Sequence, residues 1–292
     1  MKCEAIFANS SRHSVRKMCK ALGLREAAYY SWKRAEEKRN QRVRAEKEDI
    51  QTIRKVFEET HRIYGCRRIK RALEQSGKQM SKWRIRWIMR ENGLYPVQLK
   101  KFRPGKRVKP DGSYFEKIVQ QQFSPEKPNE KWVGDITYLR TKLGWVYLAA
   151  VIDLYNREVI GYAISKWIDA ELACQTLSNA IARNGKPKEL IFHSDRGCQY
   201  SSRKYQQMLE DYGIIGSMSK PGYPYDNSCM ESFFATMKKE YILRKEYDQM
   251  SSLSRDLFYY IEIFYNRKRL HSTLGYMSPV AYRLQNCQAK MA

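Results

Sequence analysis

Three β-rich runs in the middle of the chain set its fold class. They read WVGDITYL (132–139), WVYLAAVIDL (145–154) and EVIGYAIS (158–165), and a few polar residues separate each run from the next. Runs of this length that are rich in β-branched and aromatic residues are typical of consecutive paired strands. The sequence therefore predicts an antiparallel meander of three strands.

Helices and strands alternate after this meander. The pattern predicts a helix, a strand, a helix, a strand and two further helices, over residues 169–183, 189–195, 202–212, 213–219, 227–243 and 253–265. Three strands followed by this alternation indicate an α/β fold, in which helices pack on a mixed five-stranded sheet.

The first hundred residues contain no comparable strands and are predicted to be all-helical. Two helix-turn-helix patterns are present, one over residues 15–34 with its turn at Gly23, and one over residues 64–94 with its break at Gly77. A charged helix is predicted between them, over about residues 45–60. We therefore expect an all-α helix-turn-helix region ahead of the sheet.

Basic side chains accompany the last of these helices. Ser81 can cap it, and Lys82, Arg84, Arg86 and Arg90 lie mainly off its apolar stripe, where a recognition helix presents side chains to DNA. A solvated basic face on a small helical bundle is the alternative interpretation. We predict DNA contact through these four residues, because helix, break, helix and a cationic second helix coincide.

The charge of the whole chain supports a polyanionic partner. It carries 55 Lys and Arg against 31 acidic residues, a net charge of +24, and 33 of the basic but only 14 of the acidic residues precede residue 129. Such an excess favours nucleic acid or an anionic membrane surface. The surface that attracts polyanions is therefore predicted to be mostly N-terminal.

Composition also divides the chain and limits its surroundings. Residues 101–128 are basic and proline-rich, which predicts a linker between a helical region over 1–100 and a core over 129–285. The longest apolar run, 145–152, is too short to span a membrane, and the start carries no secretion signal. The seven cysteines are scattered, which argues against a disulfide framework, so we expect a cytoplasmic protein.

Three acidic residues stand on three of the predicted elements. Asp135 lies within the first strand, where an ionised group is costly unless it is paired or bound to a cation. Asp195 ends the fourth strand, and Glu231 lies one turn into the helix over 227–243. Magnesium takes oxygen ligands, commonly one or two carboxylates with waters and phosphates. Three acids that converge at one sheet edge would suit a phosphoryl-transfer site.

The spacing and context of these acids match a known pattern. Thirty-five residues separate Asp195 from Glu231, and Lys238 follows Glu231 by seven, or two helical turns. This resembles the D,D(35)E plus Lys/Arg signature of retroviral-integrase-like transposases. The segments GDITYL, HSDRGCQY, ESFF and YNRKRLHSTLGYMSP resemble the second-frame (OrfB) proteins of the IS-three family of bacterial insertion sequences. The N-terminal helices resemble that family's helix-turn-helix, so the resemblance covers nearly the whole chain.

The resemblance implies a ribonuclease-H-like core in which Asp135, Asp195 and Glu231 bind two Mg²⁺ or Mn²⁺ ions. The implied enzyme is a DNA transposase that cleaves the element's ends and joins the freed 3′-OH to another DNA strand, without a covalent enzyme intermediate. Lys238 would contact DNA near the scissile phosphate, and Asn227 would support the site or the DNA. The implied partners are the element's terminal repeats, target DNA, further copies of the chain on DNA, and an upstream-frame (OrfA) protein or fusion.

Two other functions stay open at this point. A DNA-binding regulator could keep the fold and catalyse nothing, although the three intact acids speak against it. A stand-alone nuclease of the ribonuclease-H type would not need the basic N-terminal helices, which imply binding of duplex DNA.

Three features near these motifs each have two interpretations. Asp153 could be a fourth metal ligand, but an acid in a strand-end turn is favoured. His193 could assist catalysis or be structural. The cationic stretch of Arg267, Lys268, Arg269 and His271 could bind DNA or form a solvated helix end.

Overall fold

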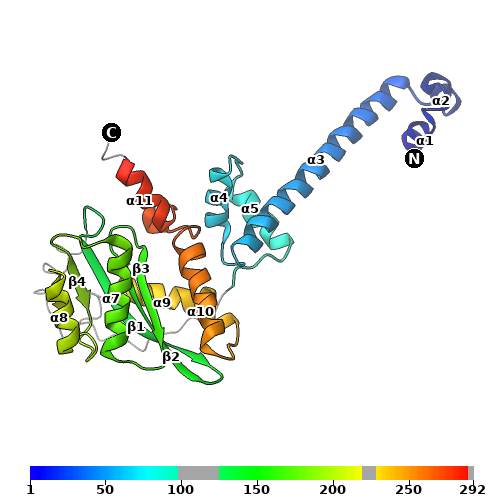
Figure 1. Cartoon of the computed structure of the whole chain (residues 1–292). Helices are drawn as coiled ribbons and strands as arrows, with labels where there is room; N and C mark the ends of the chain where they lie inside the picture. Colours follow the sequence, from blue (N-terminus) through cyan, green and yellow to red (C-terminus); the bar gives the residue numbers. More distant parts are fainter. Residues whose placement is uncertain (98–124, 219–227, 289–292) are drawn as a thin grey trace, which may run out of the picture. The chain divides into compact units, whose positions relative to one another are not determined.

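The chain forms two compact units, Met1–Pro96 and Val97–Ala292. The computed structural model describes residues 1–97, 125–218 and 228–288 (Figure 1). Asn227 and residues 101–124 of the predicted linker lie outside these ranges. Within the described ranges, no helix has both the length and the apolar character needed to cross a membrane.

The first unit is all-helical, as predicted. Its helices are α1 (Lys2–Asn9), α2 (Val15–Ala21), α3 (Glu26–Glu59), α4 (Cys66–Gln75) and α5 (Lys82–Glu91). The prediction was wrong in one respect, because the short helix expected after Gly23 and the charged helix expected over 45–60 are both parts of the single 34-residue α3. No glycine or proline occurs between its ends, so nothing in the backbone interrupts it.

Helix α3 carries a small apolar core at each end. Near its start Tyr29 is buried with Cys19 of α2, and near its end Ile53 and Phe57 are buried where α3 contacts α4 and α5. Residues 37–45 between these two ends are all exposed. The middle of α3 is therefore a polar helix that bridges two cores.

The helix-break-helix pattern before residue 96 is confirmed. Gly77 ends α4 with a positive φ of 81°, and the Ser81 hydroxyl accepts a hydrogen bond from the Arg84 backbone N–H at 3.1 Å. Ile85 and Ile88 are fully buried. The capping residue and the apolar stripe are thus where the sequence places them, and the opposite side of α5 is left for polar side chains.

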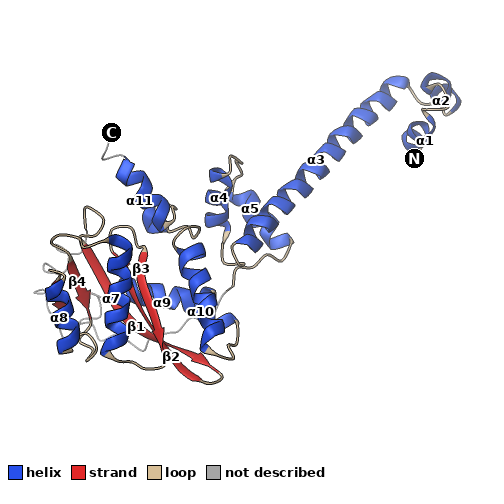
Figure 2. Ribbon diagram, viewed as in Figure 1, coloured by secondary structure: helices blue, strands red, loops and turns tan. Residues whose placement is uncertain are grey.

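The second unit is built on a five-stranded mixed sheet. Its strands are β1 (Lys131–Thr141), β2 (Gly144–Asp153), β3 (Val159–Ser165), β4 (Ile191–Ser194) and β5 (Ile215–Met218). They lie in the order β3-β2-β1-β4-β5, with β1, β2 and β3 antiparallel and β4 and β5 parallel to β1 (Figure 2). The predicted meander and the mixed sheet are confirmed.

Helices cover both faces of this sheet. They are α7 (Ala170–Asn184), α8 (Arg203–Asp211), α9 (Ser228–Glu240), η2 (Ile242–Arg244), α10 (Met250–Phe258), the π-helix η3 (Tyr259–Tyr265), η4 (Ser272–Leu274) and α11 (Pro279–Gln288). Helix α7 lies across one face, and α9 lies behind the sheet and contacts β1 (Figure 1). The α/β architecture expected from the alternation is therefore present.

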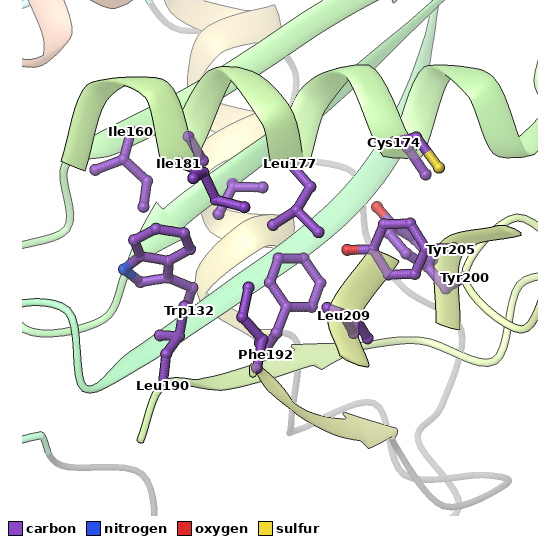
Figure 3. Packing of buried hydrophobic residues seen from close by; sticks show 14 residues of the cluster. Trp132, Ile160, Cys174, Leu177, Ile181, Leu190, Phe192, Tyr200, Tyr205 and Leu209 are labelled. Carbon is purple, nitrogen blue, oxygen red and sulfur yellow. The ribbon is translucent and has the colours of Figure 1, made fainter. Parts of the chain in front are cut away.

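The core on the α7 face joins β1 to β4. Trp132 and Phe192 are adjacent partners in the parallel pair, and both point at Leu177 and Ile181 of α7 (Figure 3). Gly134 belongs to the same face, and a Cβ there would lie only 2.5 Å from the Phe192 ring. Glycine at this position therefore lets the large Phe192 side chain pack over β1.

An aromatic layer holds α9 and the helices after it. Phe233 of α9 packs edge-on against Tyr265, with ring centroids 4.8 Å apart. The long helix predicted over 253–265 begins at Met250 and becomes a π-helix at Tyr259. The wider π turn lets Tyr260 and Tyr265, five residues apart, both be buried with their rings 6.2 Å apart.

The cationic stretch near the C-terminus is divided between structure and surface. Arg269 is buried and forms two hydrogen bonds of 2.7 Å to the Glu240 carboxylate, and Tyr260 donates a third to it. His271 is buried as well, whereas Arg267 and Lys268 are exposed. The two interpretations of this stretch, DNA binding or a solvated helix end, therefore apply only to Arg267 and Lys268.

Asp153 is the acid of a strand-end turn, as favoured. It is buried, and its two carboxylate oxygens accept hydrogen bonds from the backbone N–H groups of Asn129 at 2.8 Å and Tyr155 at 2.9 Å. Burial raises the pKa of Asp153 to about 6, because its effect is larger than that of the two N–H donors, which lower the pKa. The nearby Glu158 charge adds to the increase.

The Arg269–Glu240 pair predicts that replacing Arg269 costs far more unfolding free energy than replacing its neighbour Arg267. Arg269→Met leaves the largely buried Glu240 carboxylate without its guanidinium, and we expect it to lower the free energy of unfolding by about 3 kcal/mol. Arg267→Met, at an exposed position, should change it by less than about 0.5 kcal/mol. Urea unfolding of both variants measures this, and equal costs would contradict the buried pair.

The raised pKa of Asp153 predicts a pH-dependent stability. Its pKa is 3.8 without the fold and about 6 within it, so its proton is bound more tightly in the folded chain. The resulting stabilisation, about 3 kcal/mol, is fully present below the unfolded pKa and is lost as the pH rises through the folded one. The parent and Asp153→Asn should therefore differ in unfolding free energy by an amount that changes between pH 4 and pH 7. A constant difference would refute the shift.

Candidate catalytic site

Two of the three predicted acids belong to neighbouring strands, Asp135 within β1 and Asp195 just after the end of β4. The parallel pair of β1 and β4 aligns Val133 with His193, and Asp135 and Asp195 each follow two residues later. Adjacent strands are about 4.8 Å apart, so this register places the two backbones next to each other. Both carboxylates also act on Tyr200, whose pKa is raised first by burial and then by the charges of Asp135 and Asp195.

The two aspartates differ in their surroundings. Asp135 is partly buried, and its Oδ1 accepts a hydrogen bond from the Ile136 backbone N–H at 2.8 Å. Asp195 is exposed just beyond the last residue of β4, and its Oδ1 accepts one from the Gly197 N–H at 2.9 Å. Each carboxylate is thus oriented by a hydrogen bond from a neighbouring backbone N–H.

Helix α9 supplies the third acid and a cation. Its buried side chains are Met230, Phe233, Phe234 and Met237. Glu231, in the first turn, is exposed, and Lys238, two turns later, is half-buried. Burial lowers the pKa of Lys238, and the negative charge of Asp135 acts in the opposite direction. The Lys238 end of α9 therefore lies beside the strand that carries Asp135.

The three acids do not form a closed cluster. Among the described residues, no group of three His, Cys, Asp or Glu side chains is close enough together to hold a metal ion. Asp135 lies in β1, Asp195 follows β4 and Glu231 lies on α9. Asn227, in the segment just before α9, lies outside the described residues. The roles of these residues stay predictions.

His193 has a structural position. Its Nδ1 lies 3.0 Å from the Ser217 hydroxyl, and these two residues are register partners in β4 and β5. The side chain is buried between the strands. The structural interpretation of this residue is therefore favoured over a catalytic one.

Sequence reasoning missed two aromatic neighbours of the acids. Tyr200 is fully buried within reach of both aspartate charges, and Tyr138 has the Lys238 ammonium 4.6 Å from its ring centre. The signal was present, since Tyr138 lies in the GDITYL segment with Asp135 and Tyr200 closes the HSDRGCQY segment with Asp195.

The four cations predicted for DNA on α5 have different surroundings. Lys82 and Arg86 are exposed, and Arg90 is exposed beside the Glu91 carboxylate at 3.1 Å. Arg84 lies 3.7 Å from both Glu46 and Asp49 of α3. Arg84 is thus held within the helical unit, while the other three point outward.

Comparisons with known proteins match both units. A family described as "HTH-like domain" matches residues 44–102. Two families described as "Integrase core domain" match residues 125–224 and 212–279. The first range contains α4 and α5, and the other two contain Asp135, Asp195 and Glu231.

Relatives match almost the whole chain. "Transposase InsF for insertion sequence IS3A" of Escherichia coli (strain K12) is 35% identical over 286 residues, which are 98% of this chain and 99% of the relative. The "Insertion element IS600 uncharacterized 31 kDa protein" of Shigella sonnei is 35% identical over 91% of this chain and 97% of its own length. These shares include both the helical unit and the sheet.

Solved structures are more distant. The catalytic core domain of HTLV-2 integrase in complex with magnesium is 19% identical, with a TM-score of 0.42, over 54% of this chain and 97% of its own. A chain of the simian T-cell lymphotropic virus intasome is 19% identical, with a TM-score of 0.47, over 78% of this chain and 73% of its own.

Proposed function

The chain belongs to the IS3 family of insertion-sequence transposases, and we propose that Asp135, Asp195 and Glu231 are the acids with which it cuts and joins DNA. The observation that carries this proposal is the parallel β1–β4 register, which sets Asp135 and Asp195 side by side. Helix α9, which bears Glu231, packs against the same strand. The matched integrase core contains all three residues.

The oxygen chemistry of this donor set suits a divalent metal ion, although the three carboxylates are not close enough together in this structure to hold one. Three carboxylates offer the hard oxygen ligands that Mg²⁺ and Mn²⁺ prefer, and Asp195 and Glu231 are exposed to receive them. Asp135 and Asp195 would hold the metal from the sheet, and Glu231 would complete its ligands from α9. Two bound ions would activate the attacking oxygen and stabilise the leaving one.

The chain's own residues position the DNA for two successive displacements at phosphorus. In the first, a water oxygen bonds to the phosphorus at the element's end, and the 3′ oxygen leaves as a hydroxyl. In the second, that 3′-OH attacks a phosphodiester of another strand, whose own 3′ oxygen leaves. Lys238, held beside Asp135, would contact a phosphate next to the reacting one. Asn227, four residues before Glu231, would support the site or the DNA.

The helical unit would supply duplex recognition. Helix α5 carries Lys82, Arg86 and Arg90 on its outward side and lies within the matched HTH-like domain. We propose that these cations, with Arg84, contact the terminal repeats of the element. Because two element ends must be joined, further copies of the chain would assemble on DNA, and an upstream-frame (OrfA) protein or fusion would complete them. This work would take place in the cytoplasm, where the chromosome of a bacterial host is accessible.

Replacing an acid by its amide tests the catalytic proposal. The purified chain is incubated with labelled DNA carrying the element's ends, Mg²⁺ or Mn²⁺, and target DNA. Asp135→Asn, Asp195→Asn and Glu231→Gln should each lower product formation by a factor on the order of 10² to 10³ and leave DNA binding intact, because they remove a metal-binding charge but no bulk.

The matched control is Glu210→Gln, an exposed acid on α8 away from the strand ends, which should retain full product formation. Amide variants that cleave and join as well as the parent would refute the three roles. DNA binding without products from the parent, even with the upstream-frame protein added, would favour the regulator. Cleavage without joining would favour the nuclease.

The salt dependence of DNA affinity tests the role of α5. A side chain that neutralises one phosphate contributes about one to the slope of log affinity against log salt. Lys82→Ala and Arg86→Ala should each reduce that slope by about 1, measured by fluorescence anisotropy with terminal-repeat duplex. Lys188→Ala, an exposed lysine before the start of β4, is the control and should leave the slope unchanged. Equal slopes for all four proteins would remove α5 from the interface.

A further inference from the structure

Two exposed aromatic rings lie together on the hairpin of β1 and β2. Tyr138 is 60% exposed and Trp145 49% exposed, although both belong to strands of the central sheet. Their ring centres are 5.2 Å apart and the rings are nearly perpendicular, at 87°. They stand on diagonal positions of the antiparallel pair, since Arg140 is the register partner of Trp145. Large rings left exposed in this way indicate a binding surface.

A cation stands against each of these rings. The Arg140 guanidinium lies 5.4 Å from the centre of the Trp145 ring, and the Lys238 ammonium lies 4.6 Å from the centre of the Tyr138 ring. The four side chains therefore form a row in the order Lys238, Tyr138, Trp145, Arg140, which we call the aromatic ladder. Aromatic rings with neighbouring cations are the means by which proteins stack nucleic-acid bases and meet their phosphates.

The hairpin that carries the ladder is anchored. At its tip the Lys142 backbone N–H donates to the Tyr247 carbonyl at 2.9 Å, and the Lys142 ammonium lies 2.8 Å from the Asp248 carboxylate. On the face opposite the ladder, Leu139 and Thr141 are buried. The rings are therefore presented by a fixed strand pair and lose little conformational entropy when a ligand binds.

The ladder begins next to the candidate catalytic site. Tyr138 follows Asp135 by three residues in β1, about 10 Å along the strand, so the two side chains leave β1 on opposite faces. Lys238 joins the two, because its ammonium lies against the Tyr138 ring and also interacts with the Asp135 charge. A strand of DNA whose phosphate is at Asp135 would therefore reach the ladder by way of Lys238, the side chain that interacts with both.

The chemistry of the ladder selects unpaired DNA as its occupant. Its two cations complement a phosphate backbone, in a chain whose net charge is +24. The bases inside a duplex have no free faces, so exposed rings stack only on terminal or unpaired bases. We propose that the aromatic ladder holds the last bases of the element's end, unpaired, while their phosphodiester lies at Asp135. This rests on the proposed function and adds the state of the DNA that the site receives.

A fluorescent base tests this contact separately from the chemistry. The full chain is mixed with duplex DNA of the element's end in which 2-aminopurine replaces a base beside the scissile phosphate. Its fluorescence reports unstacking from the duplex and stacking on a protein ring. The variants are Tyr138→Thr and Trp145→Thr, which keep a β-forming residue and remove the ring, and Tyr138→Phe and Trp145→Phe, which keep a ring.

The parent and both Phe variants should show the same fluorescence change on binding. Each Thr variant should lose it and form product about tenfold more slowly, consistent with the loss of one stacked base. Trp167→Thr is the matched control, because Trp167 is 73% exposed in the loop after β3 and belongs to no ladder contact. Thermal unfolding of each variant excludes a folding defect as the cause.

The outcomes separate the ladder from the catalytic proposal. Thr variants that keep the fluorescence change would overturn the ladder proposal. A parent that forms product without any fluorescence change would overturn it too. So would a Trp167→Thr control that loses the fluorescence change as fully as the ladder variants. Asp135→Asn should keep the fluorescence change, while its product formation falls by a factor on the order of 10² to 10³. If the parent shows the fluorescence change, the Thr variants lose it, and the parent forms no product, the ladder stands and only the proposed chemistry is refuted.

Discussion

The geometry of the site depends on the parallel pairing of β1 with β4. Trp132 and Phe192 are paired residues of these strands and share the core under α7, so packing on that face fixes their register. Gly134 makes the arrangement possible, since any side chain there would overlap the Phe192 ring. A slip of one residue would reverse the faces of β4, so the same contacts that fill the core also bring Asp195 beside Asp135.

The position of α9 has a different origin, in the segments that follow it. Its apolar side packs on the aromatic layer of the π-helix η3, and Glu240 at its end is locked to Arg269 by two hydrogen bonds of 2.7 Å. The C-terminal motif around Arg269 therefore acts on the site through structure, because it holds the helix that carries Glu231 and Lys238. Arg269, part of a run that resembles a DNA-binding segment by charge, serves here to orient the helix that carries Glu231.

Local patterns predicted the parts of the fold that local forces decide. The strands follow from their β-rich runs, and the break before α5 follows from Gly77 and the Ser81 cap. The ribonuclease-H-like fold predicted for the core agrees with the five-stranded mixed sheet and the integrase-core match. The π turn at Tyr259 and the burial of Arg269 could not be predicted, because each depends on partners distant in sequence. The continuity of α3 follows from a local feature, the absence of glycine and proline between its ends, and was predictable. The neighbourhood of Asp135 and Asp195 was predictable from strand order, but the distance to Glu231 depends on how α9 packs.

The two units bring different physical resources to DNA. Before residue 129 the chain has 33 basic residues against 14 acidic, and after residue 128 it has 22 against 17. Long-range attraction to DNA therefore comes mainly from the N-terminal part. This electrostatic component of binding is screened by salt and carries little sequence information. After residue 128 the net charge is only +5, and the three acids of the candidate site repel a phosphate locally unless cations intervene. The sheet unit's hold on the reacting strand must then come from a few short-range contacts, which we propose Lys238 and the aromatic ladder to make.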